Sequence, residues 1–437
     1  MSIGVLKHRM IDLYRRTSVV RDFNNIRREV ALGPEFLNRF QKQSLAQLLL
    51  HSRQHVRFYS NILSNVRIDD ITNHPFEVHQ TLPYITKEDI INNTEEFVSE
   101  ISVKSITNST GGSTGDPLTY QVDLKCVSRT RAFDLYWWNQ AFGYRFGDRV
   151  LTIGGSSIGN SKSLQLRIYN YLQSKSFLEG GNISAEALEK NVQIICKGKY
   201  DVIYAYPSAL MLYVETAKAR GMKFRGRLKG IATTSENLTS TIRISIEAFF
   251  GAKVFDVYGA RDGGIVADEC KLQTGLHYNF QDCYVEEFSE SKEQSVPELV
   301  LTNLKSYSQP MIRYRVGDLG RVSGEPCKCG NQLPRIIDFS GRTRDLLVLS
   351  NGRIIHGSLF NKIVSYFSAI KQYQTIYDQI TLKFIMVVTP GLSNDEEKKF
   401  ISKVQELTGI EEIIVDYSGS FEYTDAGKLR TVVTKKG

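Results

Sequence analysis

Residues 109–117 read Ser-Thr-Gly-Gly-Ser-Thr-Gly-Asp-Pro, which places three glycines and four hydroxyl side chains within nine positions. Glycines let a backbone bend so that several N–H groups converge on one anion, and Ser and Thr hydroxyls add donors for phosphate oxygens. A Walker loop would end in Gly-Lys followed by Ser or Thr, whereas Asp116, Pro117 and Leu118 follow the last glycine here. The stretch therefore predicts a phosphate-binding loop that is not a P-loop. Taken alone, it is equally compatible with a flexible surface loop.

Downstream of this loop, short β-branched runs alternate with longer stretches of helical periodicity. The strand-like runs are residues 150–153, 202–205, 230–233 and 254–257, and the helix-like stretches between them include 208–220 and 240–250. Such alternation is typical of α/β folds. We therefore expect a large α/β domain with mixed sheets flanked by helices.

The pattern changes past about residue 343. Residues 380–388 resemble a strand, residues 393–407 a helix that Ser393 or Asn394 could cap, and residues 412–416 another strand. These features predict a small α+β domain. We place the two domains at residues 1–343 and 344–437.

Residues 1–60 have helical periodicity. Ile3, Leu6, Met10 and Leu13 recur at spacings of three and four, which predicts a helix that packs through this face. An alternative is that the basic flank of this region contacts anionic lipid; it comprises Arg15, Arg16, Arg21, Arg27 and Arg28.

The composition is that of a globular protein. The chain has 437 residues, of which 41% are hydrophobic and 23% charged. No run approaches the roughly 18 apolar residues that a membrane helix needs, and charges interrupt the N-terminal apolar stretches, so we expect a cytoplasmic protein without a transmembrane segment. The net charge of +8 suits anionic ligands, but the basic residues are dispersed, which argues against a nucleic-acid partner.

Four further segments follow the glycine-rich loop in a fixed order. They are Tyr258-Gly259-Ala260-Arg261-Asp262, Tyr314-Arg315-Val316-Gly317-Asp318-Leu319, Gly341-Arg342-Thr343-Arg344-Asp345 and Gly427-Lys428-Leu429-Arg430. The ordered set resembles the adenylate-forming superfamily of acyl-CoA ligases, luciferases and peptide-synthetase adenylation domains. The segments His51-Ser52-Arg53, Leu82-Pro83-Tyr84-Ile85-Thr86-Lys87, Tyr206-Pro207-Ser208, Ser235-Glu236 and Ala267-Asp268-Glu269-Cys270 are most similar to the branch of phenylacetate-CoA ligases and their relatives in capsular-polysaccharide gene clusters.

The resemblance implies a role for each matched position. The ATP-binding residues are Thr110, Gly111, Gly112, Ser113, Thr114, Gly115, Glu236, Tyr258, Gly259, Arg261, Asp262, Asp318 and Arg342. The loop from Thr110 to Gly115 would bind the β- and γ-phosphates, Tyr258 would stack on adenine, and Asp318 would accept hydrogen bonds from both ribose hydroxyls. Asp262 would hold Mg²⁺, Arg342 would add charge near the nucleotide, and Lys428 would be the catalytic residue of adenylation. Asp345 would be the hinge before the C-terminal lid.

Three positions depart from the family pattern. Leu118 stands where the superfamily loop usually has Lys, and Arg261 replaces the usual Thr or Ser. A guanidinium at that position could bind phosphate oxygens bidentately. Asp262 is one methylene shorter than the usual Glu, so a contact with Mg²⁺ through water is an alternative to direct ligation.

A second group of residues has the chemistry of a metal site. Cys270 and His277 lie in one segment, and Cys327 and Cys329 lie about fifty positions later. Thiolate and imidazole groups in this number are what a tetrahedral zinc ion prefers, so we predict a structural Zn²⁺. Ordinary reduced thiols are the alternative.

The resemblance implies that ATP and Mg²⁺ convert a small carboxylic acid to an acyl-AMP, whose acyl group then passes to an acceptor. Coenzyme A, or an amine or hydroxyl on a sugar in capsular or surface polysaccharide biosynthesis, are the acceptors left open. An aryl acid:CoA ligase is the alternative enzyme, for which Tyr136, Trp137 and Trp138 could line the acid pocket. Another alternative is a degenerate homologue that binds nucleotide without catalysis. A homodimer is compatible with all of these.

Overall fold

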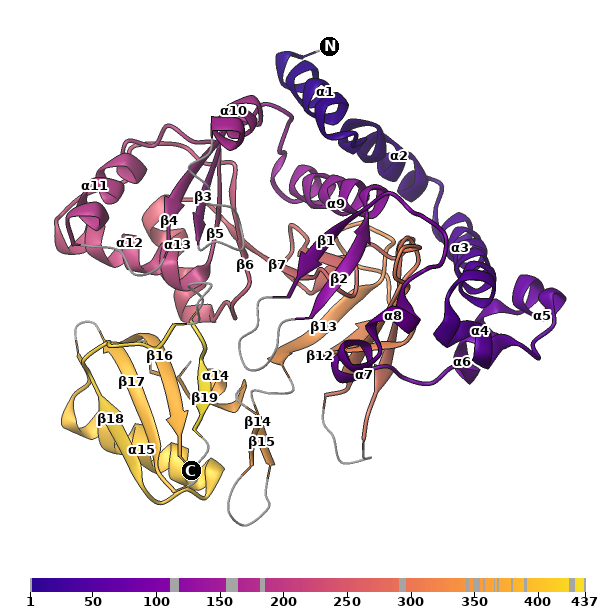
Figure 1. The fold of residues 1–437 in the computed structure, drawn as a ribbon. Helices are drawn as coiled ribbons and strands as arrows, with labels where there is room; N and C mark the ends of the chain where they lie inside the picture. The colour runs from indigo at the N-terminus through magenta and orange to yellow at the C-terminus, as the bar shows by residue number, and fades with distance from the viewer. Residues whose placement is uncertain are drawn as a thin grey trace. The chain divides into compact units, whose positions relative to one another are not determined.

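The computed structural model describes residues 2–110, 118–154, 164–180, 185–290, 296–342, 346–348, 354–356, 358–364, 366–367, 369–378, 380–388, 391–423 and 429–435. Figure 1 shows the chain, which divides into two compact units. Unit 1 contains residues 1–148, 168–174 and 255–339, and unit 2 contains residues 149–167, 175–254 and 340–437. In the described part of the chain, every helix is too short or too polar to cross a lipid bilayer.

Unit 1 begins with a series of helices. These are α1 (Ile3–Arg15), α2 (Val19–Ala31), α3 (Pro34–His55), α4 (Arg57–Leu63), α5 (Ile68–Asn73), α6 (Pro75–Thr81), α7 (Lys87–Asn92) and α8 (Thr94–Phe97), followed later by α9 (Leu124–Phe142) and α10 (Leu164–Leu172). The helices α2, α3 and α9 share a core that contains Ile26, Leu37, Phe133 and Trp137. Burial of this apolar surface fixes the long helix α9 against the neighbouring helices.

The strands of unit 1 form a hairpin and a larger sheet. They are β1 (Ser105–Ser109), β2 (Thr119–Asp123), β7 (Val254–Ala260), β8 (Ile265–Glu269), β9 (Leu276–Tyr278), β10 (Cys283–Phe288), β11 (Glu298–Asn303), β12 (Tyr314–Ser323) and β13 (Arg335–Arg342). β1 pairs antiparallel with β2 and places Ser109 opposite Thr119, so the glycine-rich loop connects the two strands of a hairpin. The other strands lie in the order β10-β11-β12-β13-β9-β8-β7. This order brings the Tyr258 and Asp318 motifs into one sheet.

Unit 2 contains the strand–helix alternation expected from the sequence. Its strands β3 (Val150–Gly154), β4 (Lys175–Glu179), β5 (Val202–Ala205) and β6 (Gly230–Thr234) lie in the order β6-β5-β3-β4, and its helices include α11 (Ala185–Cys196), α12 (Pro207–Ala219) and α13 (Ser240–Phe250). β3 pairs parallel with β4 and β5, and β5 pairs parallel with β6. Parallel pairing requires the crossover connections that these helices supply, and every residue of β3 and β6 is buried.

The C-terminal part of unit 2 is the predicted small α+β domain. It contains β14 (Leu346–Val348), β15 (Ile354–His356), α14 (Ser358–Val364), β16 (Ile370–Tyr377), β17 (Leu382–Val388), α15 (Asn394–Thr408), β18 (Ile413–Asp416) and β19 (Val432–Thr434). Four strands form a sheet in the order β18-β17-β16-β19. Ser393 caps α15 through a capping box with Glu396, as one of the two expected caps. The predicted fold class, a large α/β part with a small α+β part, is therefore confirmed.

The N-terminal helix α1 forms where the periodicity predicts it, but the prediction of its packed face is wrong. Gly4, His8 and Ile11 are buried, whereas Ile3, Leu6, Met10 and Leu13 are exposed. The physical reason is a close approach at Gly4: a Cβ atom there would lie 1.9 Å from the carbonyl oxygen of Phe146. Packing through glycine turns the apolar stripe of α1 outward.

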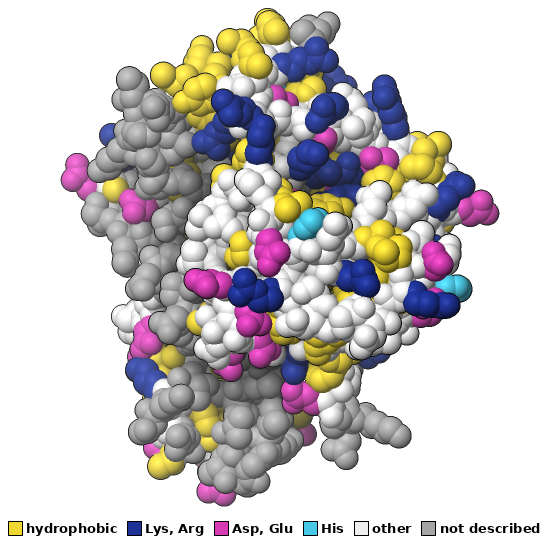
Figure 2. Space-filling model, turned by 45° about the vertical axis from the view of Figure 1, so that its right-hand side comes forward, with side chains coloured by type: hydrophobic (Ala, Val, Ile, Leu, Met, Phe, Trp, Pro, Cys, Tyr) yellow, Lys and Arg dark blue, Asp and Glu magenta, His cyan; other side chains and the backbone are white. Residues whose placement is uncertain are grey.

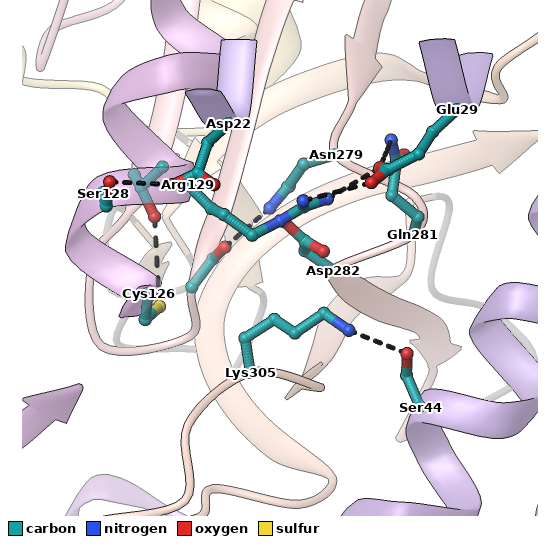
Figure 3. Close-up of polar contacts among 12 residues, drawn as sticks. Asp22, Glu29, Ser44, Cys126, Ser128, Arg129, Asn279, Gln281, Asp282 and Lys305 are labelled. Atoms are coloured by element: carbon teal, nitrogen blue, oxygen red, sulfur yellow. Dashed lines mark hydrogen bonds and ion pairs between the residues drawn. The ribbon is translucent and has the colours of Figure 1, made fainter. Parts of the chain in front are cut away.

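A buried ionic network connects α2 to α9 and to the loop before β10. Figure 3 shows the guanidinium of Arg129 directed at the carboxylates of Glu29 and Asp282, at 2.9 Å and 2.6 Å. Gln281 also donates to Glu29 at 3.3 Å. Burial alone would lower the pKa of Arg129, but the carboxylates of Asp282 and Glu29 outweigh burial and raise it. The two ion pairs tie three separate segments together.

We expect Arg129→Ala to lower the free energy of unfolding by about 3–5 kcal/mol, because removal of one partner leaves buried carboxylates without compensation. Urea denaturation would measure the loss. Arg21→Ala is the matched control, since the Arg21 side chain is 74% exposed and its closest ion pair is 4.0 Å long. The account is wrong if both variants change stability by the same amount.

Candidate nucleotide site and metal centre

Tyr258 and Asp318 lie in direct contact in unit 1. Tyr258 lies on β7, and its hydroxyl donates a hydrogen bond of 2.8 Å to Asp318 Oδ2 on β12; both side chains are buried. Gly317, immediately before the aspartate, has φ of +77°, a conformation that side chains other than hydrogen rarely allow. The glycine of this motif therefore sets the direction of the carboxylate. The Tyr258 ring packs against Phe339, with ring centroids 4.4 Å apart.

Asp262 takes part in a second tyrosine–carboxylate pair. Tyr314, the first residue of β12, donates its hydroxyl to Asp262 Oδ2 at 3.0 Å. Burial, followed by the charge of Asp262, raises the pKa of Tyr314, and the same two causes raise the pKa of Tyr120 on β2. Arg261 acts in the opposite direction on Tyr120, so its positive charge also lies near this phenol. The motifs of β7 and β12 therefore meet in two tyrosine–carboxylate hydrogen bonds, Tyr258 with Asp318 and Tyr314 with Asp262.

Strained backbone precedes Tyr314. Arg313 has φ of +57°, which is costly for a residue with a side chain. Its guanidinium donates to the carbonyls of Gln80 and Leu82 and forms an ion pair with Glu286 at 3.0 Å. These contacts hold the turn that delivers the Tyr314 hydroxyl to Asp262. Arg313 is a positioning residue that the sequence alone did not reveal.

The two ends of the glycine-rich loop are hydrogen bonded to each other. The Thr110 N–H donates to the Leu118 carbonyl at 2.9 Å, and the Leu118 N–H donates to Thr110 Oγ1 at 3.0 Å. The predicted phosphate-binding residues Gly111, Gly112, Ser113, Thr114 and Gly115 lie outside the described residues, and their role stays a prediction. Gly259 pairs with Val266 across β7 and β8.

The remaining residues predicted to bind ATP, to catalyse adenylation or to form the hinge belong to unit 2. Glu236 Oε2 accepts a hydrogen bond from the Ser208 N–H at 3.0 Å, and its Oε1 accepts one from the Leu429 N–H at 2.7 Å. Glu236 therefore contacts the segment that carries the predicted catalytic lysine. Lys428 and Asp345 lie outside the described residues, as does the side chain of Arg342, whose backbone ends β13. Their predicted roles remain untested.

The cysteine and histidine side chains predicted to bind metal do converge. One ligand atom from each of Cys270, His277, Cys327 and Cys329 lies within 4.8 Å of all the others. The Sγ atoms of Cys270 and Cys327 are 3.9 Å apart, and Cys329 Sγ is 3.4 Å from His277 Nε2. Zinc–sulfur bonds of roughly 2.3 Å in a tetrahedron require ligand separations of roughly 3.8 Å. The observed separations fit that geometry.

Burial and hydrogen bonds shift the pKa values of this Cys/His cluster. His277 Nδ1 donates to the Leu333 carbonyl at 2.8 Å, which directs the unprotonated Nε2 toward the thiols. Burial lowers the pKa of His277, so the ring is neutral. Burial would raise the pKa of Cys270, but the N–H groups of Leu272 and Thr274 outweigh it and lower that pKa. The pKa of Cys327 is lowered as well, whereas burial raises the pKa of Cys329. Zinc binds neutral imidazole and thiolate, so the Cys329 thiol would have to lose its proton on binding.

The aromatic residues considered for an acid pocket lie beside the metal cluster. Tyr136, Trp137 and Trp138 are all buried, and Trp137 stacks on His277 with ring centroids 5.8 Å apart. Tyr136 and Trp137 line a cavity of about 410 Å³ together with Cys270 and Cys329. Among the described lining residues, none is a predicted nucleotide-binding residue. Sequence reasoning also missed Tyr120, Tyr314 and Phe339, although Tyr314 opens one of the motifs.

Comparison with known proteins gives a consistent result. No protein-family model matches the chain. It is 22% identical over 370 residues to Protein CapK of Staphylococcus aureus, which covers 83% of this chain and 80% of that protein. It is also 22% identical over 368 residues to a phenylacetate-coenzyme A ligase of Thermus thermophilus, covering 79% of each. A 2-hydroxyisobutyryl-CoA ligase in its postadenylation state, in complex with 2-HIB-AMP, has the same fold, with a TM-score of 0.70, 18% identity and coverage of 90% of this chain and 89% of that one.

Proposed function

We propose that the chain is an adenylate-forming ligase, which its likeness to Protein CapK, to phenylacetate-coenzyme A ligases and to the fold of a 2-hydroxyisobutyryl-CoA ligase supports. It would activate a carboxylic acid with ATP and transfer the acyl group to coenzyme A. Adenylation converts a poor electrophile into a reactive one, because AMP is a good leaving group. The protein supplies positioning and electrostatic stabilisation. The observation that carries the proposal is the meeting of the Tyr258 and Asp318 motifs, which joins β7 to β12 through a hydrogen bond of 2.8 Å.

The residues of unit 1 suit the parts of ATP that the family pattern assigns to them. Asp318 is buried, and a carboxylate has two acceptor oxygens, one for each ribose hydroxyl. The Tyr258 hydroxyl at 2.8 Å keeps that carboxylate oriented. Tyr258 and Phe339 provide aromatic surface next to it, as an adenine ring requires. These residues would bind and orient the nucleotide.

Asp262 suits a magnesium ion shared with the substrate. Mg²⁺ prefers oxygen ligands and is commonly held by one or two carboxylates together with substrate phosphates. Asp262 offers such a carboxylate, and Tyr314 orients it at 3.0 Å. Bound Mg²⁺ would neutralise phosphate charge, and Arg261, whose charge is felt at Tyr120, would add to that effect. The positive charges of Mg²⁺ and Arg261 would replace the charge of the lysine that the family usually has at the position of Leu118.

Two acceptors for the acyl group are compatible with the comparisons. Phenylacetate-coenzyme A ligases are among the relatives, which supports coenzyme A. The likeness to Protein CapK favours a second candidate, transfer to an amine or hydroxyl of a sugar in surface-polysaccharide synthesis. Cytoplasmic residence suits both, since ATP and coenzyme A are cytoplasmic compounds. A homodimer stays a prediction.

Measurement of AMP release distinguishes the two acceptors. With a panel of aromatic, hydroxy, amino and sugar acids, we expect AMP release that depends on both an acid and coenzyme A. If pyrophosphate exchange depends on the acid but coenzyme A does not increase AMP release, the acceptor is not coenzyme A. The identity of the acid follows from the same panel.

We further propose that Cys270, His277, Cys327 and Cys329 bind one structural Zn²⁺. Four protein ligands leave no position for water or substrate, so a catalytic role is disfavoured. The ion would connect the end of β8 and strand β9 to the turn before β13. Because the ligands come from two distant segments, metal binding would contribute directly to folding stability.

We expect the purified protein to contain about one zinc per chain, as four protein ligands would bind it. Cys327→Ser should reduce the zinc content and lower the thermal midpoint more than it changes the turnover of the folded enzyme. Cys196→Ser is the matched control, since Cys196 is a buried thiol outside the cluster. Elemental analysis with thermal denaturation provides the measurement. Absence of zinc in the parent protein, or full zinc in Cys327→Ser, contradicts the assignment.

A further inference from the structure

Helix α1 exposes a continuous apolar stripe. Its members are Ile3, Leu6, Met10, Leu13 and Tyr14, and the exposed fraction reaches 84% at Leu13. At 3.6 residues per turn these positions fall within an arc of roughly 100° on one side of the helix. Isolated exposed apolar residues are common, but five on one face of a short helix form an unpartnered surface.

The stripe does not face the rest of unit 1. The opposite side of α1 is already packed, through Gly4 against the backbone of Phe146 and through His8, whose ring lies 4.8 Å from the Phe146 ring. The last turns of α10 extend the exposed apolar surface with Ile168 and Tyr171. Lys7 Nζ lies 4.9 Å from the centre of the Tyr171 ring, so Tyr171 lies next to the border of the stripe.

Positive charge surrounds this surface. Between residues 1 and 32 there are seven basic residues, Lys7, Arg9, Arg15, Arg16, Arg21, Arg27 and Arg28, and all six arginines are exposed. Figure 2 shows dark-blue side chains beside yellow ones in the upper part of the molecule, at the height where Figure 1 places α1 and α2. Lys7 and Arg9 border the stripe on its two sides, because around the helix Lys7 lies about 20° beyond Tyr14 and Arg9 about 40° beyond Leu13.

The acidic residues of the same segment are directed into the protein. The segment has three, Asp12, Asp22 and Glu29. Asp12 accepts hydrogen bonds from the N–H groups of Val19 and Val20 at the start of α2. Asp22 accepts from the Ser128 hydroxyl, and Glu29 forms the ion pair with Arg129. The outward charge of α1 and α2 is therefore almost entirely positive.

We propose that α1 lies in the plane of a membrane surface and binds anionic lipid. An apolar stripe with a basic border is the pattern of helices that insert their apolar face at the boundary of headgroups and acyl chains. Each basic side chain near such a surface strengthens the attraction to anionic headgroups. The long cationic side chains reach headgroups while Leu6 and Leu13 enter the acyl region.

A second copy of the chain fits the same surface less well. Two copies meeting through the stripe would bring the basic residues at its border close to those of the other copy, and like charges repel. A helix of 13 residues is about 20 Å long, so its stripe covers about 200 Å². A stable dimer interface needs about 800 Å² per partner. A lipid surface requires neither complementary shape nor that area.

Vesicle co-sedimentation of the full chain tests the proposal. The probes are vesicles of phosphatidylcholine mixed with phosphatidylglycerol, and vesicles of phosphatidylcholine alone. We expect at least roughly tenfold tighter binding to the anionic vesicles, and weaker binding as salt screens the charges. Leu6→Gln with Leu13→Gln should weaken binding by roughly a hundredfold, about tenfold for each leucine removed from the acyl region. Glutamine keeps the helix propensity, so α1 remains folded.

Matched controls separate the stripe from general hydrophobicity and from unfolding. Ile62→Gln with Ile68→Gln removes two exposed apolar side chains from α4 and α5 and should bind vesicles as the parent does. Equal thermal midpoints verify folding of both double variants. Equal binding to the two vesicle types, or unchanged binding of the Leu6/Leu13 variant, overturns the proposal. A concentration-dependent dimer that the Leu6/Leu13 variant abolishes would also overturn it, in favour of contact between copies.

Discussion

Replacement of Lys428 by alanine is expected to reduce acyl-adenylate formation by roughly 10²–10³-fold, the loss seen when one group that stabilises developing negative charge is removed. The lysine follows Gly427 in the last motif, and the N–H of its neighbour Leu429 donates to Glu236 at 2.7 Å. An ammonium group acts on phosphate charge in the first half-reaction. The second half-reaction, started from a synthetic acyl-adenylate and coenzyme A, should therefore keep its rate.

Lys435→Ala is the matched control for this prediction. Lys435 lies in the same C-terminal domain and forms an exposed ion pair with Glu422 at 2.9 Å. It should leave both half-reactions unchanged. Equal losses of both half-reactions in Lys428→Ala would show that the lysine supports the fold or the lid rather than adenylation.

Asp318→Ala is expected to raise the Michaelis constant for ATP by roughly 10²–10⁴-fold, with little change for the acid. Hydrogen bonds to a charged acceptor contribute roughly 1.5–3 kcal/mol each, and two ribose hydroxyls would lose theirs. Steady-state kinetics with each substrate varied in turn gives both constants. The buried position of Asp318, close to Tyr258, makes the effect local to the nucleotide.

Tyr258→Phe serves as the partial variant of the same pair. It removes the hydroxyl that orients Asp318 but keeps the aromatic ring and the carboxylate. We expect an increase in the ATP Michaelis constant well below that of Asp318→Ala. If Asp318→Ala changes the constant for the acid instead, the carboxylate belongs to the acid pocket and the ribose assignment is wrong.

The sequence predicts where the helices and strands of this fold lie better than it predicts which side of each element is buried. The predicted strands at 150–153, 202–205 and 230–233 appear as β3, β5 and β6, because β-branched runs between helical stretches leave few alternatives. For α1, periodicity identifies an apolar stripe but not what covers it. The packed side is decided by Gly4 and Phe146, which lie 142 positions apart and leave no local signal.

In the candidate site, the sequence likewise predicts which residues are involved but not all of the contacts between them. Motif order predicts Tyr258, Asp262 and Asp318, and the positions of three cysteines and one histidine in two segments predict the Cys/His cluster. The sequence does not predict which contacts the tyrosine side chains of the site make. The pairing of Tyr314 with Asp262 depends on the register of β12 and on the strained turn at Arg313, and neither is written in a local pattern. The stacking of Trp137 on His277 likewise depends on packing between segments distant in the sequence.

Acid-dependent exchange of labelled pyrophosphate into ATP tests the central claim most directly, because it reports reversible acyl-adenylate formation before any acceptor is involved. The panel contains aromatic, hydroxy, amino and sugar acids, with Lys428→Ala measured in parallel. The account predicts exchange with at least one acid, dependent on Mg²⁺ and lost in Lys428→Ala. No exchange with any acid, from protein that is folded and binds ATP, would contradict it and identify the chain as a nucleotide-binding homologue without ligase activity.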